Sequence, residues 1–197
     1  DEIYELINFK GSHESIAQFP ELKDRVIIIN GVSKGFAMTG WRLGYCVAAP
    51  EIAKACDKIQ GQFTSGASSI SQRAAIAAIN TNPAESEELR NMIETFRNRR
   101  DLFLKLLNEI PGFRSNIPDG AFYIFPDVTW YYGKSNGSVN IKNGTDLCNY
   151  LLDHAHVALV SGEAFGNPDC IRLSYATSNE ELIEAARRIK EALALLH

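Results

Sequence analysis

Short apolar runs and amphipathic stretches alternate along the chain and predict a fold that combines strands with helices. Two runs near the beginning, Val26–Ile29 and Leu43–Ala49, have the length and aliphatic content of buried strands. An Asn-Gly pair follows the first run and predicts a turn there. Because only a short segment joins the two runs, we expect the strands to be antiparallel neighbours.

Two helices are predicted after these strands. Pro50 stands at the favoured first-turn position of a helix over 51–60. Ser68 or Ser69 is expected to cap a second helix over 70–79, whose alanine-rich face allows close packing on a sheet. The inward side of the first helix is expected to comprise Ile52, Cys56 and Ile59.

The longest periodic stretch is 87–110, where apolar residues recur every three or four positions. At about 1.5 Å per residue this helix would be roughly 35 Å long, which is more than one small domain needs. We therefore expect it to link two domains.

Beyond this helix the pattern changes to short strands with two further helices, which predicts a small sheet covered by helices. One helix is expected over 145–154. Ser178 and Glu181 form a capping box before the other, which ends near His197. The strands are expected at 113–116, 121–125, 157–160 and 170–174.

Composition restricts the possible functions. The 197 residues are 45% hydrophobic and 22% charged with a net charge of −4, which is typical of a soluble globular protein and gives no basic surplus for nucleic acid or an anionic membrane. No signal peptide or long apolar span is recognisable. The cysteines lack metal-ligand spacing, so we expect no metal site and interpret them as reduced, buried thiols of a cytoplasmic protein. They are Cys46, Cys56, Cys148 and Cys170.

The segment after the first strand, NGVSKGFAMTGWRLGY, contains the chemistry that distinguishes this chain. Lys34 lies among small and apolar residues, and partial burial beside a cation lowers a lysine pKa enough to make the amine a nucleophile. Arg42 could be that cation, and its planar fork matches a phosphate group. An amine and a guanidinium in this arrangement could bind a cofactor that carries both an aldehyde and a phosphate. The alternative is that Lys34 is an ordinary exposed loop lysine and Arg42 an ordinary surface arginine.

This string resembles the lysine segment of the fold-type I pyridoxal-phosphate aminotransferases, and closely the SK-x-x-AMTGWR-x-GY form of the bacterial aspartate aminotransferase group. The resemblance implies that Lys34 forms the Schiff base with pyridoxal 5'-phosphate and that Arg42 contacts the phosphate. Some relatives carry a phosphate-binding serine where this chain has Gly31, but glycine is common in the AMTGWR group. Ser33 is a further candidate phosphate ligand.

The first residues, DEIY, resemble the D-x-x-Y of the same family. The resemblance implies that Asp1 pairs with the pyridine nitrogen and that Tyr4 hydrogen-bonds the ring hydroxyl. An anion is needed there because it keeps the nitrogen protonated, and the pyridinium is the electron sink of the reaction. A solvated terminal acid is the alternative for Asp1.

Arg172 lies in the otherwise apolar run CIRLSYAT and needs an anionic partner, because an unpaired buried guanidinium is costly. An internal Asp or Glu would satisfy it. However, R-x-S-Y-A-T preceded by S-G-E-x-F-G resembles the family signature in which this arginine binds the substrate α-carboxylate in a bidentate manner.

The resemblance covers the whole chain. It implies an α/β fold in which residues 1–92 are the later part of the cofactor-binding large domain, with a mixed sheet and helices, and 93–197 are a small α+β C-terminal domain. The expected reaction is transamination between an amino acid, aspartate or a similar one, and a 2-oxo acid in a homodimer.

Because the chain starts without methionine inside a motif, we expect a piece of a longer protein that is inactive alone. Other fold-type I enzymes, such as β-lyases or amino-acid synthases, and a cofactor-sensing regulator remain alternatives.

Overall fold

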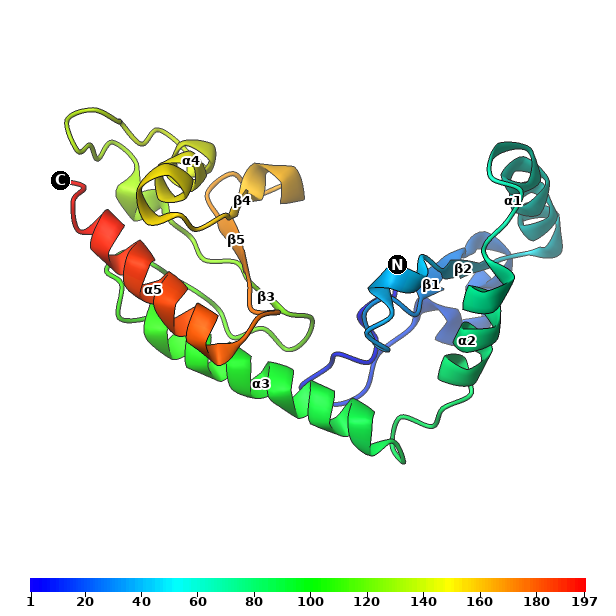
Figure 1. The fold of residues 1–197 in the computed structure, drawn as a ribbon. Coiled ribbons are helices and arrows are strands. Elements are labelled where there is room, and N and C mark those ends of the chain that lie inside the picture. Colours follow the sequence, from blue (N-terminus) through cyan, green and yellow to red (C-terminus); the bar gives the residue numbers. More distant parts are fainter. The chain divides into compact units, whose positions relative to one another are not determined.

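The computed structural model describes residues 1–197. The chain forms two compact units, Asp1–Ile93 and Glu94–His197, which are described separately below (Figure 1). Helices combine with two small sheets, so the predicted α/β class is confirmed.

The sheet of the first unit consists of β1 (Ile28–Gly31) and β2 (Gly44–Val47). The two strands are antiparallel, as predicted, with Ile28 opposite Val47 and Gly31 opposite Gly44. The prediction of a turn at the Asn-Gly pair was wrong, because both residues belong to β1. A Cβ on Gly31 would lie 3.1 Å from the Gly44 Cα, so this glycine permits close approach of two strands instead of a turn.

The helices of this unit are α1 (Pro50–Phe63) and α2 (Ser69–Ile79). Pro50 opens α1 as predicted, but the helix continues three residues past the expected end. The predicted inward face of α1 was wrong, since Ile52 is half-buried while Cys56 and Ile59 are exposed. Hydrophobic periodicity shows which residues share a helix face, but it does not show that an element covers that face.

The N-terminus of α2 also differs in one detail from the sequence interpretation. Ser68 occupies the N-cap position, but its side chain makes no capping hydrogen bond. Ser71 and Ala75 are the buried residues of α2, which agrees with close packing through small side chains.

Helix α3 (Glu87–Leu107) contains the boundary between the two units. It ends three residues earlier than predicted. The predicted apolar stripe is present, since Leu89, Phe103 and Leu107 are all buried.

The second unit has a three-stranded antiparallel sheet in the order β3–β5–β4. Its strands are β3 (Tyr123–Ile124), β4 (Val160–Ser161) and β5 (Ile171–Ser174). The predicted strand at 113–116 was wrong, because Arg114 forms only an isolated bridge with Asp127. The Phe113 N–H donates to the Ile110 carbonyl in a turn, so the pairing in this region is limited to one residue pair.

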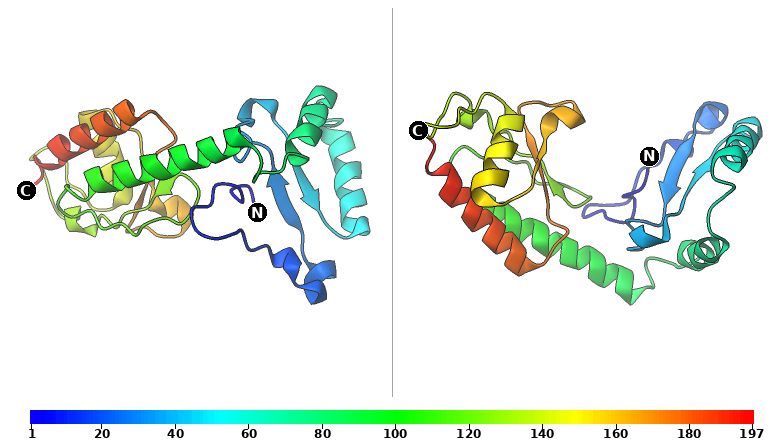
Figure 2. Two further views of the ribbon diagram at one scale, coloured as in Figure 1. Left: turned by 90° about the horizontal axis from the view of Figure 1, so that it is seen from below. Right: turned by 45° about the horizontal axis from the view of Figure 1, so that its top comes forward.

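Helices α4 (Gly144–Ala155) and α5 (Asn179–Leu193) complete this unit. α5 lies alongside α3 in the views of Figures 1 and 2. Ser178 caps α5 by accepting a hydrogen bond from the Glu181 N–H at 3.3 Å, as the capping box predicted. The largest fully buried aliphatic side chains of the unit form one core and include Leu107, Ile124, Ile141, Leu147, Leu151, Ile171, Leu173, Leu182 and Ile189.

Short 3-10 helices lie between these elements. They are η1 (Ile16–Gln18), η2 (Pro20–Arg25), η3 (Thr39–Trp41), η4 (Thr129–Tyr131) and η5 (Gly162–Phe165). Two of them lie next to predicted site residues described below, η3 beside Arg42 in the first unit and η5 near Arg172 in the second.

All four cysteines are free thiols. Cys148 and Cys170 are buried as expected, whereas Cys46 is half-buried and Cys56 is exposed on α1, so the expectation of burial was wrong for Cys56. None of the helices is both long enough and apolar enough to cross a lipid bilayer.

Candidate active site

Lys34 lies in a tight turn that begins where β1 ends. The turn is closed by a hydrogen bond from the Met38 N–H to the Val32 carbonyl at 3.3 Å and by another from the Ala37 N–H to the Lys34 carbonyl at 3.2 Å. Val32 is fully buried and anchors the turn, while Ser33 and Lys34 are both half-buried. The amine is therefore carried by a fixed backbone and not by a long flexible loop.

The segment at residues 1–7 packs directly on this turn. The Glu2 N–H donates to the Ile29 carbonyl at 2.8 Å and extends the edge of β1. A Cβ on Gly35 would lie 2.9 Å from a Leu6 methyl, so Gly35 allows this segment to approach closely. Asp1 and Tyr4 are thereby held on the segment that covers the lysine turn.

A buried amide reinforces this junction. Asn30, at the end of β1, is only 7% exposed. Its side-chain nitrogen donates to Glu5 at 2.8 Å, and its oxygen accepts from the Gly31 N–H at 2.7 Å. Both polar ends of the amide are used, so Asn30 ties the segment at 1–7 to the strand that leads into the lysine turn.

Asp1 and Tyr4 differ in their surroundings. Asp1 is exposed, and its carboxylate accepts a hydrogen bond from the Ile3 N–H at 3.1 Å. Tyr4 is half-buried. The Asp1 carboxylate is therefore accessible to a ligand, on the segment that covers the lysine turn.

Arg42 follows η3 and has an unusual backbone. Its φ of 52° and ψ of 48° place it in the left-handed region, where a residue other than glycine is strained, and Ala37 has a φ of 52° in the same loop. Arg42 is exposed, donates to the Thr39 carbonyl at 2.7 Å and makes no ion pair. Strained residues of this kind cluster at ligand-binding sites, and Arg42 keeps guanidinium N–H groups for an anion.

Arg172 lies on β5 in the second unit and is half-buried. It has no carboxylate partner within the chain, which differs from the structural ion pair that was the alternative. Instead, its guanidinium carbon lies 4.4 Å from the ring centroid of Tyr123 and 4.1 Å from that of Phe165. Sequence reasoning missed both aromatic residues, because neither lies next to Arg172 in the chain.

The turn that carries Phe165 is fixed by its backbone. The Ser161 side chain caps η5 by accepting from the Glu163 N–H, and Gly166 ends η5 with a φ of 80°. Gly162 is buried between the carbonyl groups of Asn167 and Cys170, which leave no space for a Cβ. The S-G-E-x-F-G string therefore specifies a turn that presents one aromatic ring.

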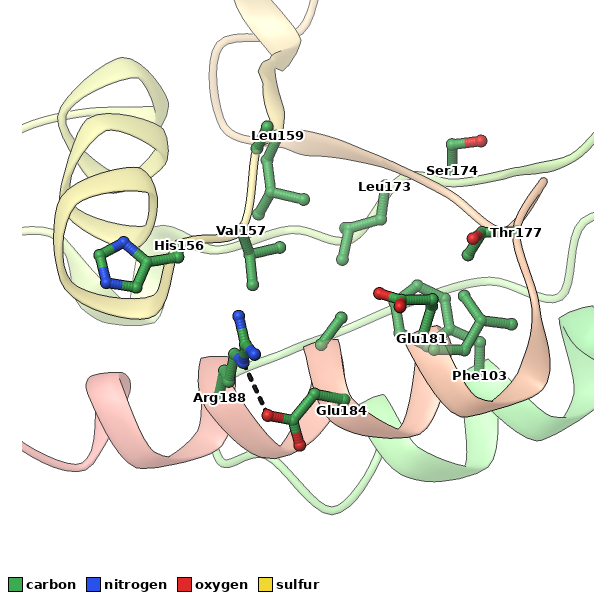
Figure 3. A pocket seen from close by; sticks show the side chains of 13 residues that line it. Phe103, His156, Val157, Leu159, Leu173, Ser174, Thr177, Glu181, Glu184 and Arg188 are labelled. Atoms are coloured by element: carbon green, nitrogen blue, oxygen red, sulfur yellow. Dashed lines mark hydrogen bonds and ion pairs between the residues drawn. The ribbon is translucent and has the colours of Figure 1, made fainter.

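A separate cavity of about 240 Å³ lies in the second unit (Figure 3). Two of its charged side chains pair with each other, since Arg188 Nε lies 2.7 Å from Glu184. Hydrogen bonds from Arg187 and Arg188 lower the pKa of Glu184 to about 2. Leu173 lines this cavity, and because side chains alternate along a strand, Arg172 faces the other side of the sheet. None of the predicted site residues lines the cavity, so we do not assign the active site to it.

Comparison with known proteins identifies the family. The model of the family "Aminotransferase class I and II" matches residues 1–189, so the chain belongs to this family. The chain is 50% identical to a bifunctional aspartate aminotransferase and glutamate/aspartate-prephenate aminotransferase of Petunia hybrida, covering 100% of the chain and 41% of that protein. It is 46% identical to an aspartate aminotransferase of Rhizobium meliloti strain 1021, covering 98% of the chain and 47% of that protein.

A solved structure gives the same result. The crystal structure of an aspartate aminotransferase from Rhizobium meliloti superposes with a TM-score of 0.92 at 44% identity, covering all of this chain and 49% of that one. The present chain thus spans about half the length of the relatives it matches.

The family cofactor is pyridoxal 5'-phosphate, and the donor set of the first unit fits it. A half-buried amine suits the aldehyde, a guanidinium without an ion pair suits the phosphate, and a carboxylate suits the pyridine nitrogen. Lys34, Arg42 and Asp1 carry these groups.

Proposed function

We propose that this chain is part of a pyridoxal-phosphate-dependent aminotransferase that transfers an amino group between an amino acid, aspartate or a similar one, and a 2-oxo acid. The observation that carries the proposal is the half-buried Lys34 in a turn fixed by β1 and covered by the segment at 1–7. The names of the aspartate aminotransferases that it resembles support the choice of substrate.

The cofactor and the chain divide the chemistry between them. When bound, pyridoxal 5'-phosphate supplies an aldehyde carbon for amines and a ring that delocalises the electron pair left when the substrate Cα loses its proton. The Lys34 amine would hold the cofactor at its aldehyde carbon and would accept the proton that leaves the substrate Cα. Asp1 keeps the ring nitrogen protonated, and Tyr4 donates a hydrogen bond to the ring oxygen.

Two residues bind the phosphate in this proposal, and a third binds the substrate. Arg42 offers the planar fork that matches phosphate oxygens, and Ser33 adds a hydroxyl donor. Arg172 binds the α-carboxylate of the substrate. Its lack of a carboxylate partner supports this role, because a guanidinium already paired with an acid would have to break that pair first.

We also propose the organisation of the whole protein. The unit Asp1–Ile93 would be the later part of the cofactor-binding large domain, and Glu94–His197 the small C-terminal domain. The protein would act as a homodimer in the cytoplasm. Light scattering of the full-length protein should give twice the mass of one chain, and a monomer would contradict the dimer.

Steady-state kinetics of the full-length protein with aspartate and a 2-oxo acid test the reaction. General acid–base catalysis contributes about 10²–10⁴-fold, so Lys34→Ala should lower kcat at least about 100-fold. Lys23, an exposed lysine on η2, is the matched control, and Lys23→Ala should retain activity. Full activity of Lys34→Ala, or absence of oxo acid product from the unmodified enzyme, would contradict the proposal.

Substitution of Arg172 separates substrate binding from cofactor binding. Hydrogen bonds to a charged group contribute about 1.5–3 kcal/mol, so Arg172→Ala should raise the KM for aspartate about 10- to 150-fold. Cofactor content should stay near that of the unmodified enzyme. An equal loss of cofactor and of substrate affinity would indicate a folding role instead.

A further inference from the structure

Two aromatic rings cover the guanidinium group of Arg172. The guanidinium carbon lies 4.1 Å from the Phe165 centroid and 4.4 Å from the Tyr123 centroid. The negative face of an aromatic ring attracts a cation placed over it. This attraction does not require a hydrogen bond from the guanidinium N–H groups. The N–H donors of a guanidinium lie in its plane, and the rings leave them available for a carboxylate.

Both rings are held by other parts of the unit. Tyr123 lies on β3 and pairs with Ser174 of the strand that carries Arg172. The Phe165 ring meets Phe125 edge to face, with centroids 6.2 Å apart and planes at 85°. The arginine is therefore flanked by rings whose own positions are set by a strand and by a rigid turn.

Phe165 is not a core residue. It is 46% exposed, whereas the residues that form the core of the unit are buried. An exposed phenylalanine gains little from burial, and the turn that carries it has space for no side chain at Gly162. Its contact with Arg172 accounts for this placement better than core packing does.

We infer that Phe165 and Tyr123 are positioning residues that hold the Arg172 guanidinium, without neutralising it, in an orientation that receives a carboxylate edge-on. The inference rests on the proposed function and adds a source of substrate specificity. A carboxylate neighbour would stabilise the same cation but would occupy the donors that the substrate needs. Aromatic neighbours keep the guanidinium oriented and leave its N–H edge unoccupied, so amines that lack an α-carboxylate are disfavoured.

Leucine and ring-conserving substitutions in the full-length holoenzyme test this inference. Removing one cation–π contact should weaken binding of aspartate, and of succinate as a carboxylate probe without an amino group, about 2- to 30-fold. Phe165→Leu and Tyr123→Leu should show this loss while kcat at saturating aspartate and the cofactor absorbance stay nearly unchanged. Phe165→Tyr and Tyr123→Phe keep the ring faces and should bind succinate nearly as well as the unmodified enzyme.

A double-mutant cycle shows whether the rings act through the arginine. In an Arg172→Ala background, Phe165→Leu should have almost no further effect on succinate affinity, since no guanidinium remains to be oriented. Unchanged affinity in the single leucine variants, or an equal loss in both backgrounds, would overturn the inference. Either result leaves the proposed function intact if the unmodified enzyme transaminates, whereas an enzyme that binds succinate but forms no oxo acid would refute the proposed function itself.

Discussion

The turn that carries Phe165 gives a sharp prediction at Gly162. The Gly162 N–H donates to the Cys170 carbonyl at 2.8 Å, and its own carbonyl accepts from the Asn167 N–H at 3.0 Å. In Gly162→Ala the new methyl group would collide with the carbonyl oxygens of these two residues and lie 2.8 Å from the Cys170 carbonyl carbon. All of these are backbone atoms, so the collision cannot be relieved by rotating a side chain.

The expected cost follows from these contacts. Overpacking costs about 1–3 kcal/mol, and moving the turn also weakens two backbone hydrogen bonds worth about 1 kcal/mol each. We therefore expect a loss of about 3–5 kcal/mol in local stability. Gly133→Ala is the control, because that glycine has no atom within 4 Å of an added Cβ and only its φ of 84° opposes the change, at about 1–2 kcal/mol.

Amide hydrogen exchange of the full-length protein measures this effect locally. Peptides from β5 and α4 should exchange at least about 100-fold faster in Gly162→Ala, because every 1.4 kcal/mol of opening free energy is a factor of ten. Aspartate affinity should also fall, since Phe165 moves with the turn. If the β5 and α4 peptides exchanged no faster in Gly162→Ala than in Gly133→Ala, the claim that backbone atoms leave no space for a Cβ at Gly162 would be refuted.

Two further predictions concern thiol and carboxyl groups. Exposed Cys56 should react first with a maleimide, whereas Cys148 should react only after unfolding, because burial raises the pKa of its thiol to about 11; mass spectrometry of labelled peptides checks this order, and early labelling of Cys148 would contradict it. The side-chain and backbone hydrogen bonds from Thr129 lower the pKa of Asp127, so this carboxylate stabilises the fold above about pH 4 and the stabilisation is lost as the pH falls through the lowered pKa. Thr129→Val should therefore lower the unfolding temperature at pH 6 and have a smaller effect near pH 3, and an equal effect at both pH values would refute this role of Asp127.

Much of the first unit could be predicted because the relevant information is local in sequence. Two apolar runs predicted β1 and β2, and the lysine motif between them predicted the turn that carries Lys34. The turn expected at Asn30 was wrong because Gly31 faces another glycine across the sheet, which a single strand cannot reveal. The face of α1 was wrong for the same reason, since burial depends on a second element.

The surroundings of Arg172 in the second unit could not be predicted either, for the same reason. Its apolar strand predicted that the guanidinium needs a partner, but the sequence could not show whether that partner is acidic. Tyr123 reaches Arg172 only because β3 pairs with β5, and Phe165 only because Gly162 allows a tight turn. Contacts between segments that are distant in the chain decide the environment of this residue, and the three-dimensional structure was needed to find them.

Chemical trapping of Lys34 tests the central claim most directly. The full-length protein, loaded with pyridoxal 5'-phosphate and reduced with borohydride, should yield one peptide with a stable pyridoxyl group on Lys34 in mass spectrometric mapping. Loss of the label after incubation with aspartate before reduction would link the same amine to the reaction. A label on another lysine, or no label on a protein that binds the cofactor, would contradict the account.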